Sequence, residues 1–467
     1  MKKVMYGAEK WIQSNIVIWL IVIVGILIHG LLCFGQAIWL DEALTGTYIR
    51  MGWPELLAFT TTDVHPPLYY FIVKAGITLL GDHIHVVKLF SFVPFVLMLA
   101  MTATKVKKAY GEKEAFVLLV FLCTTPCIIN RNAEMRMYQW AMFFVFAFAV
   151  YLFEAVNSQT RKAWICTLVF GVLAAYTHYY ALVAVAILYA LVFFANCKTK
   201  AVVYRVLLNA VVSVIAYLPW LVVFLGQAKT LKETGWWQEA GLGLQDVYEF
   251  LIWPFEDRTG YEPVFFLLLL VSACVYVFCK KDCENRMQAM LCIGVYLLLI
   301  LSGIMIIVLY QPVFITRFIY PTVGVLLFGL ALIVSKWRTE VICVMSVLVL
   351  VFAAKTYNSQ LHYQYNEDSV PALNAFMETV GEDALFICDQ DAVKCIIEYL
   401  YPDVRVENDT DVDRNLIEDE KLYYFVCNES SLEEDRLETL NVSQYEYVGE
   451  ISLMYHGFEI HEIIRER

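Results

Sequence analysis

Two short stretches near the start of the chain carry residue types suited to chemistry at a membrane surface. Trp39–Leu40–Asp41–Glu42 follows the first long apolar run, and Asp63–Val64–His65–Pro66–Pro67–Leu68–Tyr69–Tyr70 comes about two dozen residues later. Ionisable groups beside hydrocarbon are costly and usually mark a functional site. The alternative is that Asp41 and Glu42 only solvate the exit of a helix, since the flanks of membrane helices are often charged.

Three later stretches add cations and aromatic rings. They are Glu134–Met135–Arg136–Met137–Tyr138, Thr177–His178–Tyr179–Tyr180, and Gln311–Pro312 with Thr316–Arg317–Phe318–Ile319–Tyr320–Pro321. Taken singly, each could be a plain interfacial anchor, because Arg and Tyr side chains commonly snorkel at membrane surfaces. Together with the first two stretches, they place carboxylates, two histidines and two arginines at one surface.

This set of side chains suits the transfer of a sugar from a lipid phosphate. The leaving group would be an anionic polyprenyl phosphate at headgroup depth, so cations must receive its charge. A carboxylate must take the proton of the acceptor hydroxyl. The activated donor carries its own energy, so no ATP is needed.

The composition indicates a protein that crosses a membrane many times. Of 467 residues, 60% are hydrophobic and 17% are charged, and the mean hydropathy is +0.61. Soluble proteins have about 45–50% apolar and about 25% charged residues. The net charge of −12 comes from the end of the chain, where residues 356–467 hold 26 Asp and Glu against 7 Lys and Arg. Such an acidic tail argues against nucleic acid as a partner.

Eleven apolar runs are long enough to be predicted membrane spans. They cover residues 16–34, 84–104, 114–130, 138–156, 163–178, 180–197, 203–223, 262–280, 288–310, 315–334 and 339–355. The Lys and Arg clusters between them alternate consistently only with this count and a cytoplasmic N-terminus. Leu68–Leu80 is then a helix that lies along the interface, and the first run is an uncleaved span instead of a signal peptide.

The predicted fold class is an α-helical polytopic membrane protein with a small C-terminal α/β soluble domain. Residues 1–355 form the transmembrane catalytic domain with its first outer loop at 36–83, and residues 356–467 form an acidic extracytoplasmic domain. In the tail we predict strands at Ala384–Cys388, Leu422–Cys427, Tyr447–Leu453 and Phe458–Ile464, and helices at Val370–Val380, Ala392–Leu400 and Leu432–Leu440. The tail has no Gly-rich phosphate loop, which favours an accessory role. Its cysteines Cys388, Cys395 and Cys427 allow at most one internal disulfide.

The order of these stretches resembles that of the GT-C superfamily of membrane glycosyltransferases, of the bacterial glycosyltransferase family 39 type. Relatives of that type include protein O-mannosyltransferases and lipid A aminoarabinose transferase. The matching pieces span residues 39–321 and are Asp41–Glu42, His65–Pro66–Pro67–Leu68–Tyr69–Tyr70, Glu134-x-Arg136-x-Tyr138, Thr177–His178–Tyr179–Tyr180, Pro219–Trp220 and Arg317–Phe318-x-x-Pro321. Trp236–Trp237–Gln238 resembles the Trp-Trp-Asp motif of oligosaccharyltransferases, but its Asp is absent.

The resemblance implies a GT-C-like fold, a cell-membrane location and an inverting transfer of a hexosyl or pentosyl group. The donor would be an undecaprenyl- or dolichyl-phosphate sugar, and the acceptor a hydroxyl of a cell-envelope glycan, a lipid or a protein. Asp41 would be the general base, with Glu42 and Glu134 as further catalytic carboxylates. The predicted contacts of the donor phosphate are His65, Arg136, Tyr138, Arg317 and Lys74.

His65 departs from the pattern, because some relatives have a Lys that contacts the lipid phosphate at that place. Both phosphate binding and metal binding are therefore open for His65. Some relatives bind a divalent metal ion at this surface, and the predicted ligands in this chain are Asp63, His65 and His178.

Two other functions remain open from the residues alone. A polytopic lipid or glycan transporter or flippase would not need Asp41 as a base, and it would carry charged residues at mid-membrane, where this chain has almost none. An inactive family member acting as a scaffold is the second alternative.

Overall fold

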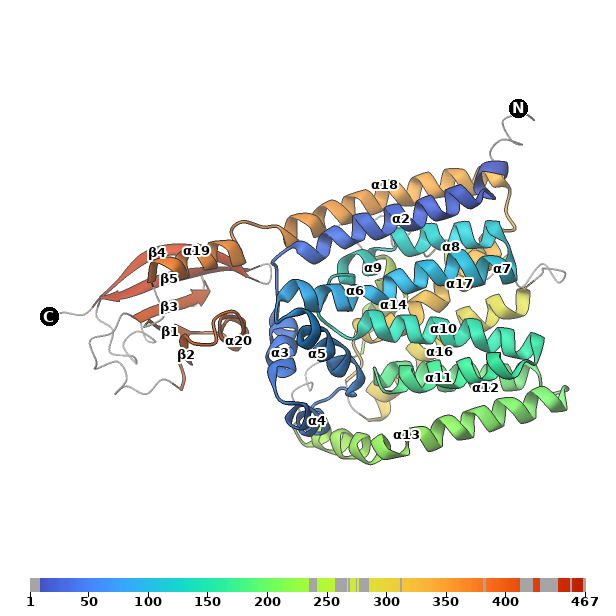
Figure 1. The fold of residues 1–467 in the computed structure, drawn as a ribbon, viewed down its shortest axis with the longest axis horizontal. Helices are drawn as coiled ribbons and strands as arrows, with labels where there is room; N and C mark the ends of the chain where they lie inside the picture. The colour runs from blue at the N-terminus through green and yellow to red at the C-terminus, as the bar shows by residue number, and fades with distance from the viewer. Residues whose placement is uncertain are drawn as a thin grey trace.

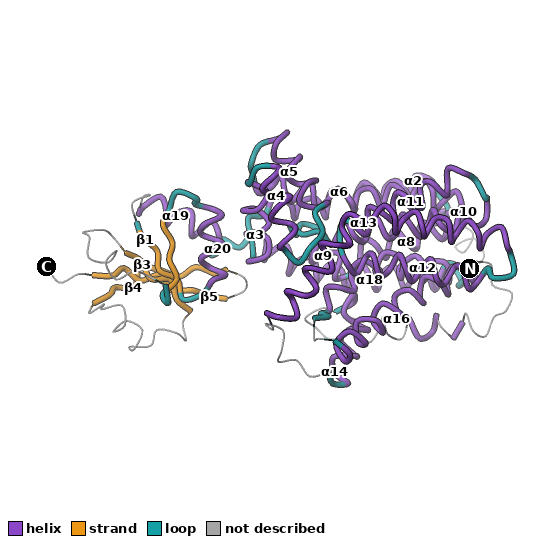
Figure 2. The backbone as a smooth tube through the Cα atoms, turned by 90° about the horizontal axis from the view of Figure 1, so that it is seen from below, coloured by secondary structure: helices purple, strands orange, loops and turns teal. Residues whose placement is uncertain are grey.

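A long bundle of helices and a smaller part built around one β-sheet make up the computed structural model (Figures 1 and 2). The structure describes residues 9–234, 242–256, 267, 269–273, 275–276, 285–310, 313–380, 384–411, 423–428, 444–453 and 456–464. Four predicted features lie wholly or mostly outside these residues: Trp236–Trp237–Gln238, the span 262–280, Gln311–Pro312 and the tail helix Leu432–Leu440.

The described helices of the bundle are α2 (Asn15–Leu31), α3 (Leu40–Arg50), α4 (Trp53–Thr62), α5 (Leu68–Leu80), α6 (Ile84–Met101), α7 (Lys107–Tyr110), α8 (Glu112–Thr124), α9 (Pro126–Arg131), α10 (Tyr138–Ser158), α11 (Arg161–Ala175), α12 (Tyr179–Ala195), α13 (Lys200–Thr234), α14 (Leu244–Ile252), α16 (Arg286–Leu309), α17 (Val323–Val334) and α18 (Thr339–Gln364). Short turns of 3-10 helix are η1 (Leu32–Phe34), η3 (Trp253–Phe255) and η4 (Thr316–Thr322), and η2 (Thr102–Val106) is a π-helical turn.

The core of the bundle lies around α17 and α10. Every residue of α17 is buried, as expected of a helix that is apolar on all sides. By contrast, α13 lies at the edge of the bundle and presents apolar side chains outward, such as Val222, which is 75% exposed. In a membrane, lipid chains would cover such residues.

Seven helical segments among the described residues are long and apolar enough to cross a membrane: Asn15–Phe34, Ile84–Tyr110, Tyr138–Ser158, Lys200–Thr230, Arg286–Leu309, Thr316–Val334 and Thr339–Gln364. They correspond to seven of the eleven predicted spans, so the helical polytopic fold is confirmed, and the number eleven stays a prediction. The predicted spans 163–178 and 180–197 form the shorter helices α11 and α12. The run 114–130 is divided into α8 and α9, because Pro126 lacks an N–H group and keeps Thr125 extended.

Residues 36–83, which we predict to be the first outer loop and call so below, lie at the end of the bundle that faces the sheet (Figure 1). This loop folds into three short helices, α3, α4 and α5, and α5 has the bounds predicted for an interfacial helix, Leu68–Leu80. The last helix of the bundle, α18, runs parallel to α2 and leads into the sheet part at the same end. It continues past the predicted domain boundary at residue 355 and ends at Gln364.

Basic connections gather at the opposite end of the bundle. Lys336 Nζ lies 2.9 Å from Glu114 Oε1, and Lys113 Nζ donates to the carbonyl of Trp337 at 2.8 Å. These contacts join the first turn of α8 to the connection before α18. The alternation of basic clusters along the sequence places these two segments on the same side of the membrane, so they are expected at the same end of the bundle.

The C-terminal part is a five-stranded mixed sheet with two described helices. Its strands are β1 (Leu385–Cys388), β2 (Arg405–Asn408), β3 (Tyr423–Asn428), β4 (Gln444–Leu453) and β5 (His456–Ile464), and its helices are α19 (Val370–Val380) and α20 (Asp391–Leu400). The strand order is β2-β1-β3-β5-β4. β1 is parallel to β2 and β3, whereas β5 is antiparallel to β3 and β4. The four predicted strands are confirmed, β2 was not predicted, and Cys388, Cys395 and Cys427 are all unpaired.

Helix α20 of the sheet part packs against α3 of the first outer loop (Figures 1 and 2). The guanidinium of Arg50 lies 4.4 Å from the centre of the Tyr399 ring, and its Nη1 donates to the Tyr399 carbonyl at 2.7 Å. Gly46 faces the same ring so closely that a Cβ at this position would overlap it. The outer loop is therefore packed between the bundle and the sheet part.

This arrangement predicts that the outer loop and the sheet part are accessible from the same side of the membrane. Thr61→Cys in α4 and Glu450→Cys in β4 introduce exposed cysteines, and we expect both to be labelled by an impermeant thiol reagent in intact cells. The exposed native Cys197 lies in a connection that we predict to be cytoplasmic, and it should react only after permeabilisation.

Labelling is measured as the increase over the parent chain, which contains further cysteines. If Glu450→Cys reacted only after permeabilisation while Thr61→Cys reacted in intact cells, the shared side would be disproved.

Candidate active site

Helix α3 positions the first acidic pair. Its N-cap residue is Trp39, whose backbone N–H donates to Oε2 of Glu42 at 3.2 Å. A carboxylate three residues into a helix satisfies a donor that has no partner within the helix, and acidic residues in a first turn interact favourably with the helix dipole. Asp41 and Glu42 therefore both stabilise the start of α3, and the helix fixes the direction of each side chain.

Glu42 points inward and joins the first outer loop to the second. The residue is 2% exposed, and its Oε1 accepts a hydrogen bond from the backbone N–H of Met135 at 2.8 Å. Burial raises the pKa of Glu42 to about 7, although the nearby Lys88 and the two backbone donors oppose that rise. Glu42 was predicted as a catalytic residue, and its contacts show that it also holds two loops together.

Asp41 points the other way and meets two guanidinium groups. Its Oδ2 lies 3.2 Å from Nη1 of Arg317 and 3.8 Å from Nη2 of Arg136. Arg136 is 5% exposed, and its Nη1 also donates to the Asp41 carbonyl and to Thr45 Oγ1, both at 3.2 Å. The Asp41 and Arg317 side chains are 19% and 24% exposed. The carboxylate therefore lies between two cations at a place that solvent reaches.

His65 lies between Arg136 and Asp63. Arg136 Nη2 lies 3.3 Å from His65 Nε2, and Asp63 Oδ2 lies 3.4 Å from His65 Nδ1. An arginine can only donate, so Nε2 accepts and the proton of a neutral imidazole must be on Nδ1, facing Asp63. Burial lowers the pKa of His65, and Arg136 lowers it further while Asp63 opposes both effects. The ring is thus neutral near pH 7 and orients Arg136.

The turn before α12 brings His178 to the same place. The backbone N–H of Leu68 donates to the Tyr176 carbonyl at 3.1 Å, which fixes the turn beside the start of α5. The His178 ring lies 6.2 Å from the His65 ring and 5.7 Å from the Tyr138 ring, measured between centres. His178 is 3% exposed, and its Nδ1 accepts a hydrogen bond from the backbone N–H of Tyr180 at 3.2 Å. It serves as a packed aromatic side chain beside the cations.

Two predicted residues have their charge satisfied outside this group. Glu134 Oε2 accepts from Nη1 of Arg131 at 2.6 Å. The ammonium of Lys74 donates to the carbonyls of Ile49 and Met51 at the end of α3. The structure thus brings together Asp41, Asp63, His65, Arg136, Arg317, Tyr138 and His178. Phosphate binding by Lys74 and catalysis by Glu134 stay predictions, and their observed contacts are structural.

The predicted metal ligands do not form a tight set. Asp63 and His65 are neighbours, but His178 meets His65 only through a ring contact. Within the described residues, one group of three or more His, Cys, Asp or Glu side chains has all its ligand atoms within 4.8 Å of one another, and it lies in the sheet part. A metal bound to Asp63, His65 and His178 stays a prediction.

Two cations that matter here were not predicted. Arg131 precedes Glu134 by three residues, and that spacing could have indicated the pair. Lys88 on α6 is fully buried and lies near Glu42. A single lysine in an otherwise apolar span is itself a signal, because such a cation needs buried acceptors.

Comparisons with known proteins bear on the family resemblance and on the fold. A family model described as dolichyl-phosphate-mannose-protein mannosyltransferase matches residues 64–222, which include His65, Arg136 and His178. No protein of curated function matches the sequence significantly. The resemblance that the motifs predicted is confirmed.

Two solved structures of one protein share the fold. ArnT from Cupriavidus metallidurans in the apo state has a TM-score of 0.64 at 11% sequence identity, over 96% of this chain and 98% of that chain. The same protein bound to undecaprenyl phosphate has a TM-score of 0.62 at 12% identity, over the same shares. The fold thus extends over both the bundle and the sheet part.

The contacts of Glu42 predict a loss of stability for Glu42→Gln. A glutamine has one acceptor oxygen, so one of the two backbone donors, Trp39 or Met135, must lose its partner. A buried unsatisfied donor costs about 1–3 kcal/mol, so the thermal unfolding midpoint in detergent should fall.

The matched control is Glu55→Gln. Glu55 accepts from the Gly52 N–H at 2.9 Å in the same position of α4, but it is exposed to solvent. Equal midpoints for the two variants would show that Glu42 does not hold the loops together.

The lowered pKa of His65 predicts a loss of stability in mild acid. Because the folded pKa lies below 6.5, the unfolded chain binds more protons as the pH falls, so stability is present at neutral pH and is lost as the pH falls through the folded pKa. His65→Gln keeps an acceptor for Arg136 and cannot titrate, so its unfolding midpoint should change less between about pH 6.5 and 5. Parallel pH profiles would contradict this assignment.

Proposed function

We propose that this chain is an integral-membrane glycosyltransferase that transfers a sugar from a polyprenyl-phosphate-linked donor to a hydroxyl acceptor. The reaction takes place on the extracytoplasmic side and inverts the anomeric carbon. The matching family model is described by a dolichyl-phosphate sugar donor, and one solved structure of the same fold holds undecaprenyl phosphate. Both support a polyprenyl phosphate as the donor carrier.

One observation carries the proposal, and it is the position of the Asp41 carboxylate between Arg136 and Arg317. Arginine keeps its charge at any relevant pH and binds phosphate oxygens in a fixed planar geometry. Two such groups beside one carboxylate, at the end of a membrane bundle, provide a receptor for a leaving phosphate and a base for an incoming hydroxyl.

The ion pairs of Asp41 suggest how donor binding would prepare the base. When the donor phosphate arrives, Arg317 and Arg136 turn from the carboxylate to the phosphate oxygens. The Asp41 carboxylate is then released from its ion pairs and can accept a hydrogen bond from the incoming hydroxyl. Donor binding would thus expose the base.

The chemical step then follows from the positions of these groups. The acceptor oxygen forms a bond to the anomeric carbon while the bond from that carbon to the phosphate oxygen breaks. The hydroxyl proton goes to Asp41, and the polyprenyl phosphate leaves as an anion stabilised by Arg136 and Arg317. His65 and Asp63 act one step away, since they orient Arg136.

The proposal predicts that Asp41→Asn abolishes most transfer without loss of fold. An amide is nearly isosteric with a carboxylate but cannot accept the proton, and loss of a general base costs about 10²–10⁴-fold in rate. The measurement is single-sugar transfer from a synthetic polyprenyl-phosphate sugar in liposomes, with donor binding measured separately.

Asp82→Asn is the matched control. Asp82 is in the same outer loop and its carboxylate also pairs with an arginine, Arg50, at 2.7 Å, but it is exposed. We expect Asp82→Asn to keep near-normal transfer. Near-normal transfer by Asp41→Asn would move the base to another carboxylate, and loss in both variants to the same degree would indicate a structural effect.

A further inference from the structure

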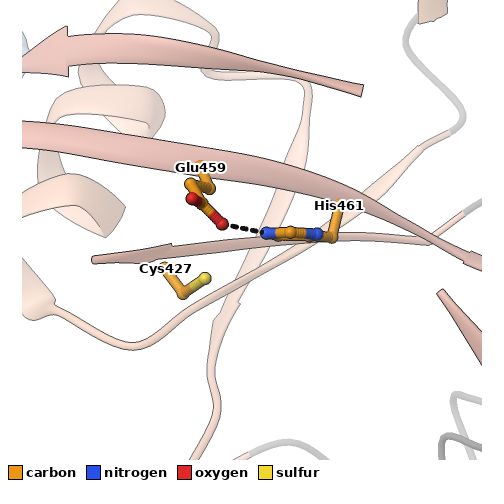
Figure 3. Close-up of side chains that lie close together, drawn as sticks. All are labelled: Cys427, Glu459 and His461. Atoms are coloured by element: carbon orange, nitrogen blue, oxygen red, sulfur yellow. Dashed lines mark hydrogen bonds and ion pairs between the residues drawn. The ribbon is translucent and has the colours of Figure 1, made fainter. Parts of the chain in front are cut away.

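A cluster of three potential metal ligands lies in the sheet part, away from the site described above. Cys427 is on β3, and Glu459 and His461 are on β5 (Figure 3). In the antiparallel pairing of these strands, Cys427 lies directly opposite Glu459, and His461 lies two residues further along β5, opposite Phe425. Side chains alternate between the faces of a sheet, so all three project from the same face.

The ligand atoms of the three side chains are close enough to share one ion. One atom of each lies within 4.8 Å of the others, and His461 Nε2 is 2.8 Å from Glu459 Oε2. Atoms held on one ion by bonds of about 2.0–2.3 Å are at most about 4.5 Å apart. Small changes of side-chain rotamer would therefore bring all three onto a common ion.

Burial and charge favour a cation at this place. Cys427 is fully buried and His461 is 5% exposed, whereas the Glu459 side chain is 29% exposed and leaves a way in from solvent. A second carboxylate, that of Asp389, is near. Asp389 directly follows Cys388 at the end of β1, and Cys388 pairs with Val426, the neighbour of Cys427 on β3. The negative charge of Asp389 acts on the Cys427 thiol. The His461 Nδ1 atom is buried without a hydrogen-bond partner among the described residues.

We propose that Cys427, Glu459 and His461 form a binding site for a divalent transition metal of the zinc type. Thiolate, imidazole and carboxylate are the three protein ligands that zinc prefers, and three protein ligands leave one position for water. The ion would join β3 to β5 and so fasten the β4–β5 hairpin to the parallel strands β1 and β2. The proposal is independent of the sugar-transfer reaction and of the metal prediction at Asp63.

The plain alternative is a buried thiol beside a His461–Glu459 hydrogen bond. A cobalt titration separates the two, because Co²⁺ bound to a thiolate gives a charge-transfer absorption that Co²⁺ on nitrogen and oxygen ligands lacks. The full-length protein in detergent is freed of metal with a chelator and titrated with Co²⁺, and then with Zn²⁺ in competition. We expect one Co²⁺ with thiolate charge transfer, displaced by Zn²⁺, and a higher unfolding midpoint with Zn²⁺.

The matched control is Cys388→Ser, which removes an equally buried cysteine from the neighbouring strand. Cys388 pairs with Val426 and therefore lies on the opposite face from Cys427. Cys388→Ser should keep the charge-transfer band, Cys427→Ser should lose it, and His461→Gln should bind Co²⁺ more than about tenfold more weakly.

Absence of a thiolate band in the parent protein would overturn the proposal. Equal Co²⁺ affinity of the parent and of His461→Gln would also overturn the proposal. His461→Gln retains the thiol, so this comparison gives a result even if Cys427→Ser fails to fold. Because no readout involves sugar transfer, these outcomes do not depend on the proposed enzyme activity.

Discussion

The buried ammonium of Lys88 fixes the entry to the first outer loop. It is 0% exposed and donates three hydrogen bonds, each of 2.8 Å, to the carbonyls of Gly35 and Ala37 and to Oε1 of Gln364. A buried cation that lost such acceptors would cost several kcal/mol. The segment between α2 and α3 and the end of α18 must therefore stay together in the folded protein. Backbone bonds from Gln36 and Ala37 to the Gln364 carbonyl reinforce the same junction.

Everything at the candidate active site is placed relative to this junction. The N-cap of α3, Trp39, comes three residues after Gln36, and Glu42 then ties α3 to Met135. Arg136 follows directly and reaches back to Asp41. The site is thus assembled from segments far apart in the sequence, which are joined by hydrogen bonds between side chains and backbone groups and by the ion pairs of Asp41.

Much of the architecture could be predicted from the sequence, because hydrophobic periodicity is strong in this chain. The bounds of α5 and α19 agree with the predicted ones, and four strands of the tail lie where apolar runs indicated them. β2 was missed because its four residues, Arg405–Asn408, include two charged side chains and an amide. The span 114–130 was predicted as one helix, although Pro126 divides it.

Only part of the site's membership could be predicted from the sequence, and its contacts could not. The motifs indicated Asp41, His65, Arg136 and Arg317, which do lie together. They could not reveal that Lys74 is satisfied by backbone carbonyls, because carbonyl acceptors leave no trace in a sequence. The role of Lys88 could not be predicted for the same reason, because two of its three acceptors are backbone carbonyls. Asp41 and Glu42 look equivalent in the sequence, but Asp41 faces Arg136 and Arg317, whereas Glu42 faces the backbone of Met135 in the interior.

The contact between α20 and α3 limits how such proteins can be recombined. Gly46 and Arg50 on one side of α3 fit the Tyr399 ring, while Glu42 and Thr45 on other positions of the same helix fit the bundle. An exchanged C-terminal part would bring a different surface to α3 and would disturb the helix that carries Asp41. A sheet part taken from a relative must therefore keep a surface around Tyr399 that fits Gly46 and Arg50, because α3 itself cannot be exchanged without loss of its contacts with the bundle.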